Sequence, residues 1–136
     1  SPPSLCFSLP QMLEVLPPGG SKGDGVRRLL EMEGLAGSGD GDGGDGDGSG
    51  VGGGSVGGGV VEGLMALGDA ENDLGMLEMS AVGVAMGNAA NDAVVAAARG
   101  LRTRPNDDDG AARALEALLA AGLDVAELRA ALRRGV

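Results

Sequence analysis

Two aspartates and an asparagine follow a short apolar run in the middle of the chain. The run, Leu-Met-Ala-Leu at 64–67, leads through Gly68 to Asp69, Asn72 and Asp73. Carboxylate oxygens are the ligands that Mg²⁺ prefers, and Mg²⁺ completes its shell with waters and substrate phosphate. A helix that starts here would also point free backbone N–H groups at an anion. The same spacing suits an ordinary turn with Asp73 capping a helix, and spacing alone leaves both interpretations open.

Composition limits the chemistry that the rest of the chain can offer. These 136 residues include no histidine and one cysteine, Cys6, which excludes Ser-His-Asp and Cys-His catalysis, histidine-ligated zinc and an internal disulfide. The net charge of −10 argues against nucleic acid as a partner, and suits either divalent cations or a solvated acidic surface. No apolar run reaches the roughly 20 residues of a membrane span, so we expect no membrane partner. We expect a soluble intracellular protein, in the cytoplasm or an organelle stroma.

The elements that must position these residues alternate between strands and helices. Strands are expected within 4–16, broken at Pro10, and at 60–67, 82–86 and, less regularly, 101–104. Helices are expected from the Ser21 capping box to about Glu33, over 73–80, after Asn91, after a cap at 106–110, and after Asp124. This order predicts an α/β fold with a parallel sheet. Ligands of such sheets lie at the carboxyl ends of strands, where we expect Asp69 and the pair 87–88.

Helical spacing also predicts which side chains face the core. On the helix that follows 106–110 we expect Leu115, Leu118 and Leu119 on the inner face. On the last helix we expect Leu128 and Leu132 in the same role. Because aromatic residues are nearly absent, leucine, valine, methionine and alanine must make the core.

Glycine fills residues 37–59, with some serine, aspartate and valine, which predicts a flexible, disordered linker. Within it, 45–49 fits the pattern D-x-D-G-S, but no apolar strand precedes it to fix its carboxylates. The same stretch imitates the start of a calcium loop, although Val56 stands where a bidentate glutamate belongs. Outside it, the acidic run at 107–110 is explained as a helix cap. We therefore reject these motifs as nucleophiles, and an acidic calcium-binding module is a weak alternative function.

The string LMALGDAENDLGMLEMSAVGVAMGNA, residues 64–89, resembles the haloacid dehalogenase-like (HAD) hydrolases, and within them the Cof-type sugar-phosphatase branch. The pattern there is G-D-x-x-N-D-x-x-M-L followed by G-V-A-M-G-N-A. Residues 106–119 are similar to the N-D-x-D-G-V-A-x-A-L block of that branch, and residues 13–35 to its L-E-I-x-P-x-G-x-x-K-G block and the next helix. The resemblance implies the C-terminal half of a Rossmann-like parallel sheet, with the glycine-rich segment as an insertion.

The resemblance implies site roles. Asp69 would bind Mg²⁺, and Asp73 would hold the metal directly or through water. Asn72 would contact the phosphoryl group, and Lys22 would neutralise charge on the phosphate and the nucleophile; the alternative for Lys22 is a solvated surface lysine. In this family an aspartate attacks the phosphate ester, and water hydrolyses the aspartyl-phosphate. That aspartate belongs to an N-terminal D-x-D-G-[TS] motif, which we expect to lie before Ser1.

The implied organisation is 1–18 as the tail of a cap domain, 19–36 and 60–122 as the HAD-like core, 37–59 as the linker, and 123–136 as a C-terminal helix. The implied function is the C-terminal part of a Mg²⁺-dependent phosphatase for small phosphorylated metabolites, such as sugar phosphates. Alone it would be inactive, because the nucleophile is absent. Its expected partner is the missing N-terminal half of the same protein. The alternative is a non-catalytic HAD-like remnant or binding module. A fragment of this kind should expose a sheet edge and an apolar face.

Overall fold

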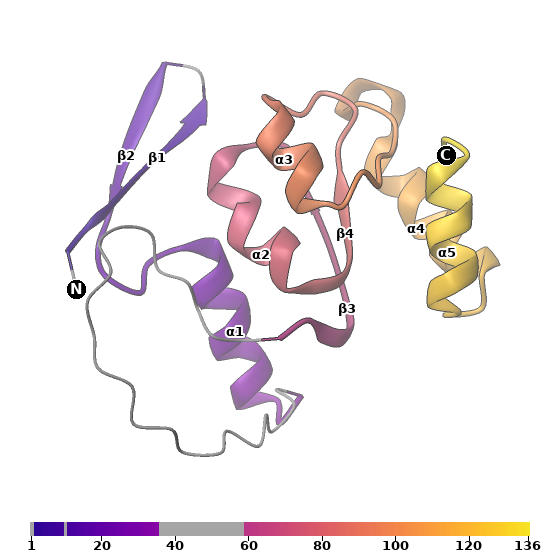
Figure 1. Cartoon of the computed structure of the whole chain (residues 1–136), viewed down its shortest axis with the longest axis horizontal. Coiled ribbons are helices and arrows are strands. Elements are labelled where there is room, and N and C mark those ends of the chain that lie inside the picture. Colours follow the sequence, from indigo (N-terminus) through magenta and orange to yellow (C-terminus); the bar gives the residue numbers. More distant parts are fainter. Residues whose placement is uncertain (1, 10, 36–58) are drawn as a thin grey trace.

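The computed structural model describes residues 2–9, 11–35 and 59–136. Strands and helices alternate along most of this part of the chain, so the α/β prediction is confirmed (Figure 1). All of the predicted linker except Gly59 lies outside the described residues, and so do the motifs at 45–50.

The centre of the fold is a pair of parallel strands. β3 (Val61–Gly68) pairs with β4 (Ser80–Ala85), and every residue of β4 is buried, as expected for a strand covered on both faces. The strand expected at 101–104 is reduced to a single parallel bridge between Ala85 and Arg102. The left-handed Gly100 (φ +76°) precedes this bridge, and Pro105, which has no N–H to donate, follows it. Gly100 and Pro105 therefore limit the number of residues that can pair with β4 on either side of Arg102.

Helices cover both faces of this strand pair, as in a Rossmann-like sheet (Figure 1). On one face, α2 (Leu74–Met79) and α3 (Asp92–Ala97) bury Leu77 and Val94 against Ala85. On the other face, α4 (Gly110–Ala120) and α5 (Val125–Arg133) pack against Val82 and Val84. The alternation of Val82, Val84 and Ala85 between the two clusters follows from the two-residue period of a strand. The inward positions predicted for Leu128 and Leu132 are confirmed.

The inner face predicted for α4 is wrong at two of three positions. Leu115 and Leu119 are 51% and 76% exposed, whereas Ala114 and Ala117 are buried. The reason lies at Gly110, where an added Cβ would collide with the carbonyl oxygen of Arg104. This close approach turns the face of Gly110, Ala114 and Ala117 inward, and the two leucines then point away from the core.

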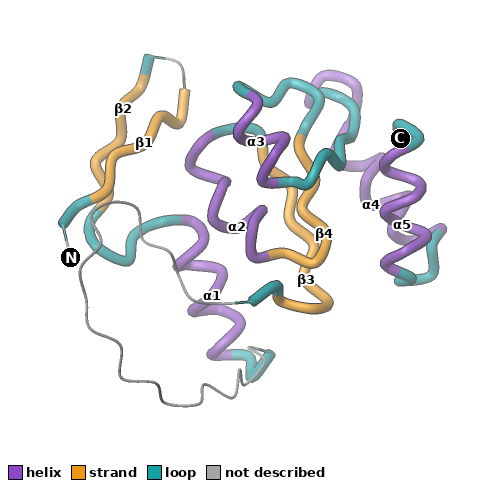
Figure 2. The backbone as a smooth tube through the Cα atoms, in the orientation of Figure 1, coloured by secondary structure: helices purple, strands orange, loops and turns teal. Residues whose placement is uncertain are grey.

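The N-terminal part consists of a hairpin and one helix. β1 (Ser4–Leu9) and β2 (Met12–Leu16) pair antiparallel as a separate sheet (Figure 2). Pro10, where the break is predicted, lies outside the described residues. α1 (Lys22–Met32) begins with the predicted capping box, in which the Ser21 hydroxyl accepts from the backbone N–H of Asp24 at 3.1 Å. α1 packs against α2 closely, since a Cβ on Gly23 would lie 3.1 Å from the carbonyl carbon of Gly75.

Large apolar side chains on the hairpin and on α1 face solvent. They are Leu5, Phe7, Met12, Leu13, Val15, Leu29, Met32 and the following Leu35. Within the described ranges, β3 has a strand partner on one edge only. Among the helices of the described part, none combines the length and the apolar character needed to cross a membrane.

Candidate active site

The turn after β3 is built around the side chain of Asp73. β3 ends at Gly68, and the 3₁₀ turn η1 (Glu71–Asp73) carries Asp73 back over this glycine. Asp73 Oδ2 accepts hydrogen bonds from the backbone N–H groups of Asp69 at 2.9 Å and Ala70 at 3.2 Å. A Cβ on Gly68 would lie 2.5 Å from the Cβ of Asp73, so the turn requires glycine at this position.

Lys22 reaches this turn from the first residue of α1. Its Nζ lies 2.6 Å from Oδ1 of Asp73 and 3.3 Å from Oδ1 of Asn72. The Asp73 side chain is 4% exposed and the Lys22 side chain 52%, so a buried carboxylate holds a lysine that still faces solvent. Lys22 is thus half solvated, as the alternative of a surface lysine expects, and is also held at this turn by Asp73, so its role stays a prediction. Three of the four predicted site residues meet at one point.

Asp73 has both oxygens engaged, one by Lys22 and one by two backbone N–H groups. A direct bond to a metal would cost one of these interactions. Of the two roles expected for Asp73, contact with a metal through water fits this arrangement better than direct ligation.

Asp69, the fourth predicted residue, is exposed just past the end of β3. Its Oδ2 accepts from the Asn88 side-chain amide at 2.9 Å, while Oδ1 of Asn88 accepts from the backbone N–H of Asn106 at 2.9 Å. The strand ends of β3 and β4 therefore meet the start of η2 (Asn106–Asp108) at one edge of the sheet. The sequence predicted that residues 87–88 lie at this edge, but it predicted no role for Asn88. The G-N-A motif that contains Asn88 is the sequence signal that could have identified it.

The donor set fits Mg²⁺ with few protein ligands. Oδ1 of Asp69 accepts no hydrogen bond from any described residue, so it can bind a cation. Over the same residues, no group of three or more Asp, Glu, Cys or His side chains lies close enough to form an all-protein metal site. Mg²⁺ is commonly held by one or two carboxylates, with waters and phosphate oxygens completing the octahedron. Asp69 supplies one such carboxylate, and the other ligands would come from outside this cluster.

The acidic run at 107–110 has a different environment. Asp108 pairs with Arg104 at 3.2 Å and Arg113 at 3.7 Å, all three side chains being about half exposed. Asp109 is the N-cap residue that precedes α4; it has a left-handed conformation (φ 54°), and its side chain makes no capping bond. The predicted side-chain cap is therefore wrong: the glycine-permitted approach of Gly110 to Arg104 sets this turn, and Gly110 N–H donates to the Pro105 carbonyl.

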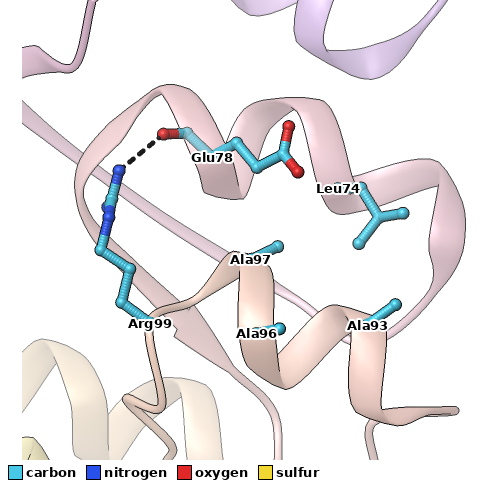
Figure 3. Close-up of a pocket in the computed structure, with 6 residues that line it drawn as sticks. All are labelled: Leu74, Glu78, Ala93, Ala96, Ala97 and Arg99. Carbon is cyan, nitrogen blue, oxygen red and sulfur yellow. Dashed lines mark hydrogen bonds between the residues drawn. The ribbon is translucent and has the colours of Figure 1, made fainter. Parts of the chain in front are cut away.

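A shallow hollow of about 410 Å³ lies between α2 and α3 (Figure 3). It is lined by Leu74, Glu78, Ala93, Ala96, Ala97 and Arg99. The guanidinium of Arg99 donates to the backbone carbonyls of Glu78 and Ser80, each at 2.9 Å, and so satisfies the end of α2. None of the four candidate site residues lines it, so the candidate site is the exposed strand edge and not this hollow.

Residues 60–115 match a family model described as haloacid dehalogenase-like hydrolase. A curated protein of Arabidopsis thaliana named "Endoribonuclease YBEY, chloroplastic" is 35% identical over 105 residues, which is 76% of this chain and 13% of that protein. One of Haemophilus influenzae named "Putative phosphatase" is 33% identical over 113 residues, which is 83% of this chain and 33% of that protein. No solved structure matches significantly.

The family resemblance is thereby confirmed. Residues 60–115, which hold Asp69, Asn72, Asp73 and Asn88, are the part of the chain that is similar to the haloacid dehalogenase-like hydrolases. The chain spans one third or less of the length of the two curated relatives described above.

Proposed function

We propose that this chain carries the metal-binding and phosphate-binding part of a Mg²⁺-dependent phosphatase of the Cof type, acting on small phosphorylated metabolites such as sugar phosphates. The observation that carries the proposal is the contact of Lys22 with Asn72 and Asp73, across 50 and 51 residues of sequence. This contact brings the ammonium group of Lys22 to the end of β3, where the exposed carboxylate of Asp69 also lies. A lysine, an amide and a metal-ligating carboxylate are the groups that transfer of a phosphoryl group needs.

Lys22 and Asn72 would bind the phosphoryl group. The ammonium of Lys22 has donors only, so the amide oxygen of Asn72 faces it and the Asn72 NH₂ group remains to donate to a phosphoryl oxygen. Lys22 offers its exposed side as a positive charge for the same oxygens. Asp73 holds Lys22 in place and fixes the turn after β3.

Asp69 would hold Mg²⁺ through its Oδ1, with Asp73 contacting the ion through water. A bound Mg²⁺ neutralises charge on phosphoryl oxygens and orients them for displacement. Asp69 is rigid at both of its backbone groups, since its N–H donates to Asp73 and its carbonyl accepts from Ala90 at 2.7 Å.

The attacking aspartate would lie outside these 136 residues. Its carboxylate oxygen would bond to phosphorus as the ester oxygen leaves with a proton, and water would then hydrolyse the aspartyl-phosphate to free phosphate. The chain covers 33% of the relative named as a phosphatase, which leaves room for such a segment elsewhere in a longer protein. The nuclease activity named for the Arabidopsis relative is not proposed, because 13% of that protein is matched and a net charge of −10 opposes binding to RNA phosphates.

The test is hydrolysis of p-nitrophenyl phosphate by the complete protein that carries these residues, with and without Mg²⁺. Asp69→Ala should lower kcat/KM by about 100-fold or more, because it removes the metal-binding carboxylate. Asp107→Ala, which removes an exposed carboxylate in η2, is the matched control and should retain full turnover. Equal loss in both variants, or none in Asp69→Ala, would contradict the proposal.

The 136-residue chain alone should show no turnover. If it hydrolyses the ester, the attacking group lies within these residues. If the complete protein binds phosphorylated metabolites but hydrolyses none, the HAD-like binding module is the correct alternative.

A further inference from the structure

The side-chain amide of Asn88 lies between the proposed metal ligand Asp69 and the backbone of a third segment. We propose that Asn88 is a positioning residue, which fixes the orientation of the Asp69 carboxylate and couples it to the turn at Asn106. The inference rests on the proposed function, because it concerns how Asp69 holds Mg²⁺.

The orientation of the Asn88 amide is dictated by its partner. The backbone N–H of Asn106 can only donate, so the group that faces it at 2.9 Å must be the amide oxygen of Asn88. The NH₂ group then points to Asp69 Oδ2, also at 2.9 Å. Of the two ways in which an asparagine amide can be placed, only this one satisfies both neighbours.

The consequence for Asp69 is that one carboxylate oxygen is held and the other is available. Asp69 lies in an exposed turn, where a side chain without a partner would sample several rotamers. The Asn88 amide holds Oδ2, which leaves Oδ1 in a defined position. Groups of this kind, which hydrogen-bond a metal ligand without touching the metal, commonly control metal affinity.

The third segment is fixed independently of any ligand. The N–H of Gly87 donates to the Arg104 carbonyl at 3.1 Å, and a Cβ on Gly87 would collide with Pro105. This glycine therefore lets the segment that ends in Asn106 lie directly against the loop that carries Asn88. A change at Asn106, which contacts neither proposed ligand group, should reach Asp69 through the Asn88 amide.

The test compares Mg²⁺ affinity, measured by isothermal titration calorimetry, in variants of the complete protein. Asn88→Ala should weaken Mg²⁺ binding by about 10- to 100-fold, the usual range for a partner of a metal ligand. Asn106→Pro removes the N–H that orients the amide, at a first turn position that tolerates proline, and should weaken Mg²⁺ binding to a smaller extent. In the double variant the two effects should not add, because both act through one amide.

Asn91→Ala is the matched control. Asn91 lies in the same loop and caps α3 by accepting from Val94 N–H at 3.2 Å, so its loss should lower the melting temperature and leave Mg²⁺ affinity unchanged. Unchanged affinity in Asn88→Ala, or additive effects in the double variant, would overturn the inference and leave the proposed function standing. If Asn88→Ala fails to fold, Asn106→Pro decides: unchanged affinity in that variant overturns the coupling. A wild-type protein that neither binds Mg²⁺ nor hydrolyses esters would overturn the proposed function, and the role of Asn88 with it.

Discussion

Two acid-rich turns in this chain have similar sequences and different surroundings. Each is a 3₁₀ turn that leads into a helix: η1 spells Glu-Asn-Asp before α2, and η2 spells Asn-Asp-Asp before α4. In the first, Asp73 is 3% exposed and binds a lysine from 51 residues away. In the second, Asp108 is about half exposed and binds two arginines that lie four and five residues away.

The difference shows what separates the surroundings of the two carboxylates. Local spacing is nearly the same in both turns, so spacing alone does not separate them. The long-range partner does: Lys22 is delivered to η1 by a close helix crossing at Gly23, whereas the arginines of η2 are neighbours in sequence. Burial adds to this, because a carboxylate out of water must have partners to remain charged.

The largest difference between the two turns should appear when the last aspartate of each turn, Asp73 in η1 and Asp108 in η2, is replaced by alanine. Asp73→Ala leaves two backbone N–H groups without their acceptor and should lower the free energy of unfolding by about 2 to 4 kcal/mol. Asp108→Ala removes two solvent-screened pairs and should cost about 0.5 kcal/mol or less. Urea unfolding of the two variants measures both. Similar losses would show that η1 is no more specific than η2.

A smaller contrast concerns two glycines that an added methyl group would affect in opposite ways. Gly68→Ala forces a Cβ against Asp73, and should destabilise the protein by about 1 to 3 kcal/mol. Gly25→Ala adds a Cβ in open space inside α1, and should stabilise by about 0.5 to 1 kcal/mol. Thermal unfolding of the two variants is the measurement. A neutral Gly68→Ala would mean that Asp73 can leave its place over the strand end at no cost.

The smallest effect on stability should come from the lysine itself. Lys22 is 52% exposed, so solvent screens its pair with Asp73, and Lys22→Met should lower the free energy of unfolding by about 1 kcal/mol or less. Arg104→Met removes a similarly exposed cation from the more exposed carboxylate of Asp108, and should have a similarly small effect on unfolding. In the complete protein only Lys22→Met should lower turnover, by about 100-fold or more. Equal turnover in the two variants would remove the functional distinction between the turns.

Much of this arrangement could be predicted from local sequence. The capping boxes and caps at Ser21, Asn91 and Asp124 are short-range interactions, and all three form as expected. The end of β3 at Gly68 also follows from the apolar run that precedes it. The position of Lys22 near Asp73 was predicted only from its resemblance to a family motif. Local sequence rules do not predict a contact between residues that are 51 positions apart.

The failures share a physical cause. The inner face of α4 is set by the approach of Gly110 to the backbone of Arg104, which hydrophobic periodicity does not record. The role of Asn88 depends on the N–H of Asn106, a backbone group with no side-chain signature. Residue types alone therefore do not predict contacts between backbone atoms, or the close approaches that glycine allows because it has no Cβ. They do predict helix caps and strand ends.

The crossing of α1 over η1 also has a consequence for the order in which the site assembles. The strand end, its turn and the Asn88 amide join residues within 19 positions of one another, apart from the link to Asn106, whereas the lysine must close a chain of 51 residues. Closing a longer chain costs more entropy, so the lysine should dock late in folding and leave early in partial unfolding. Hydrogen exchange should then show the amides of α1 opening while those of Asp69 and Ala70 remain protected. The ammonium group of Lys22, which would bind the phosphate, would therefore be the last part of the site to form during folding and the first to be lost during unfolding.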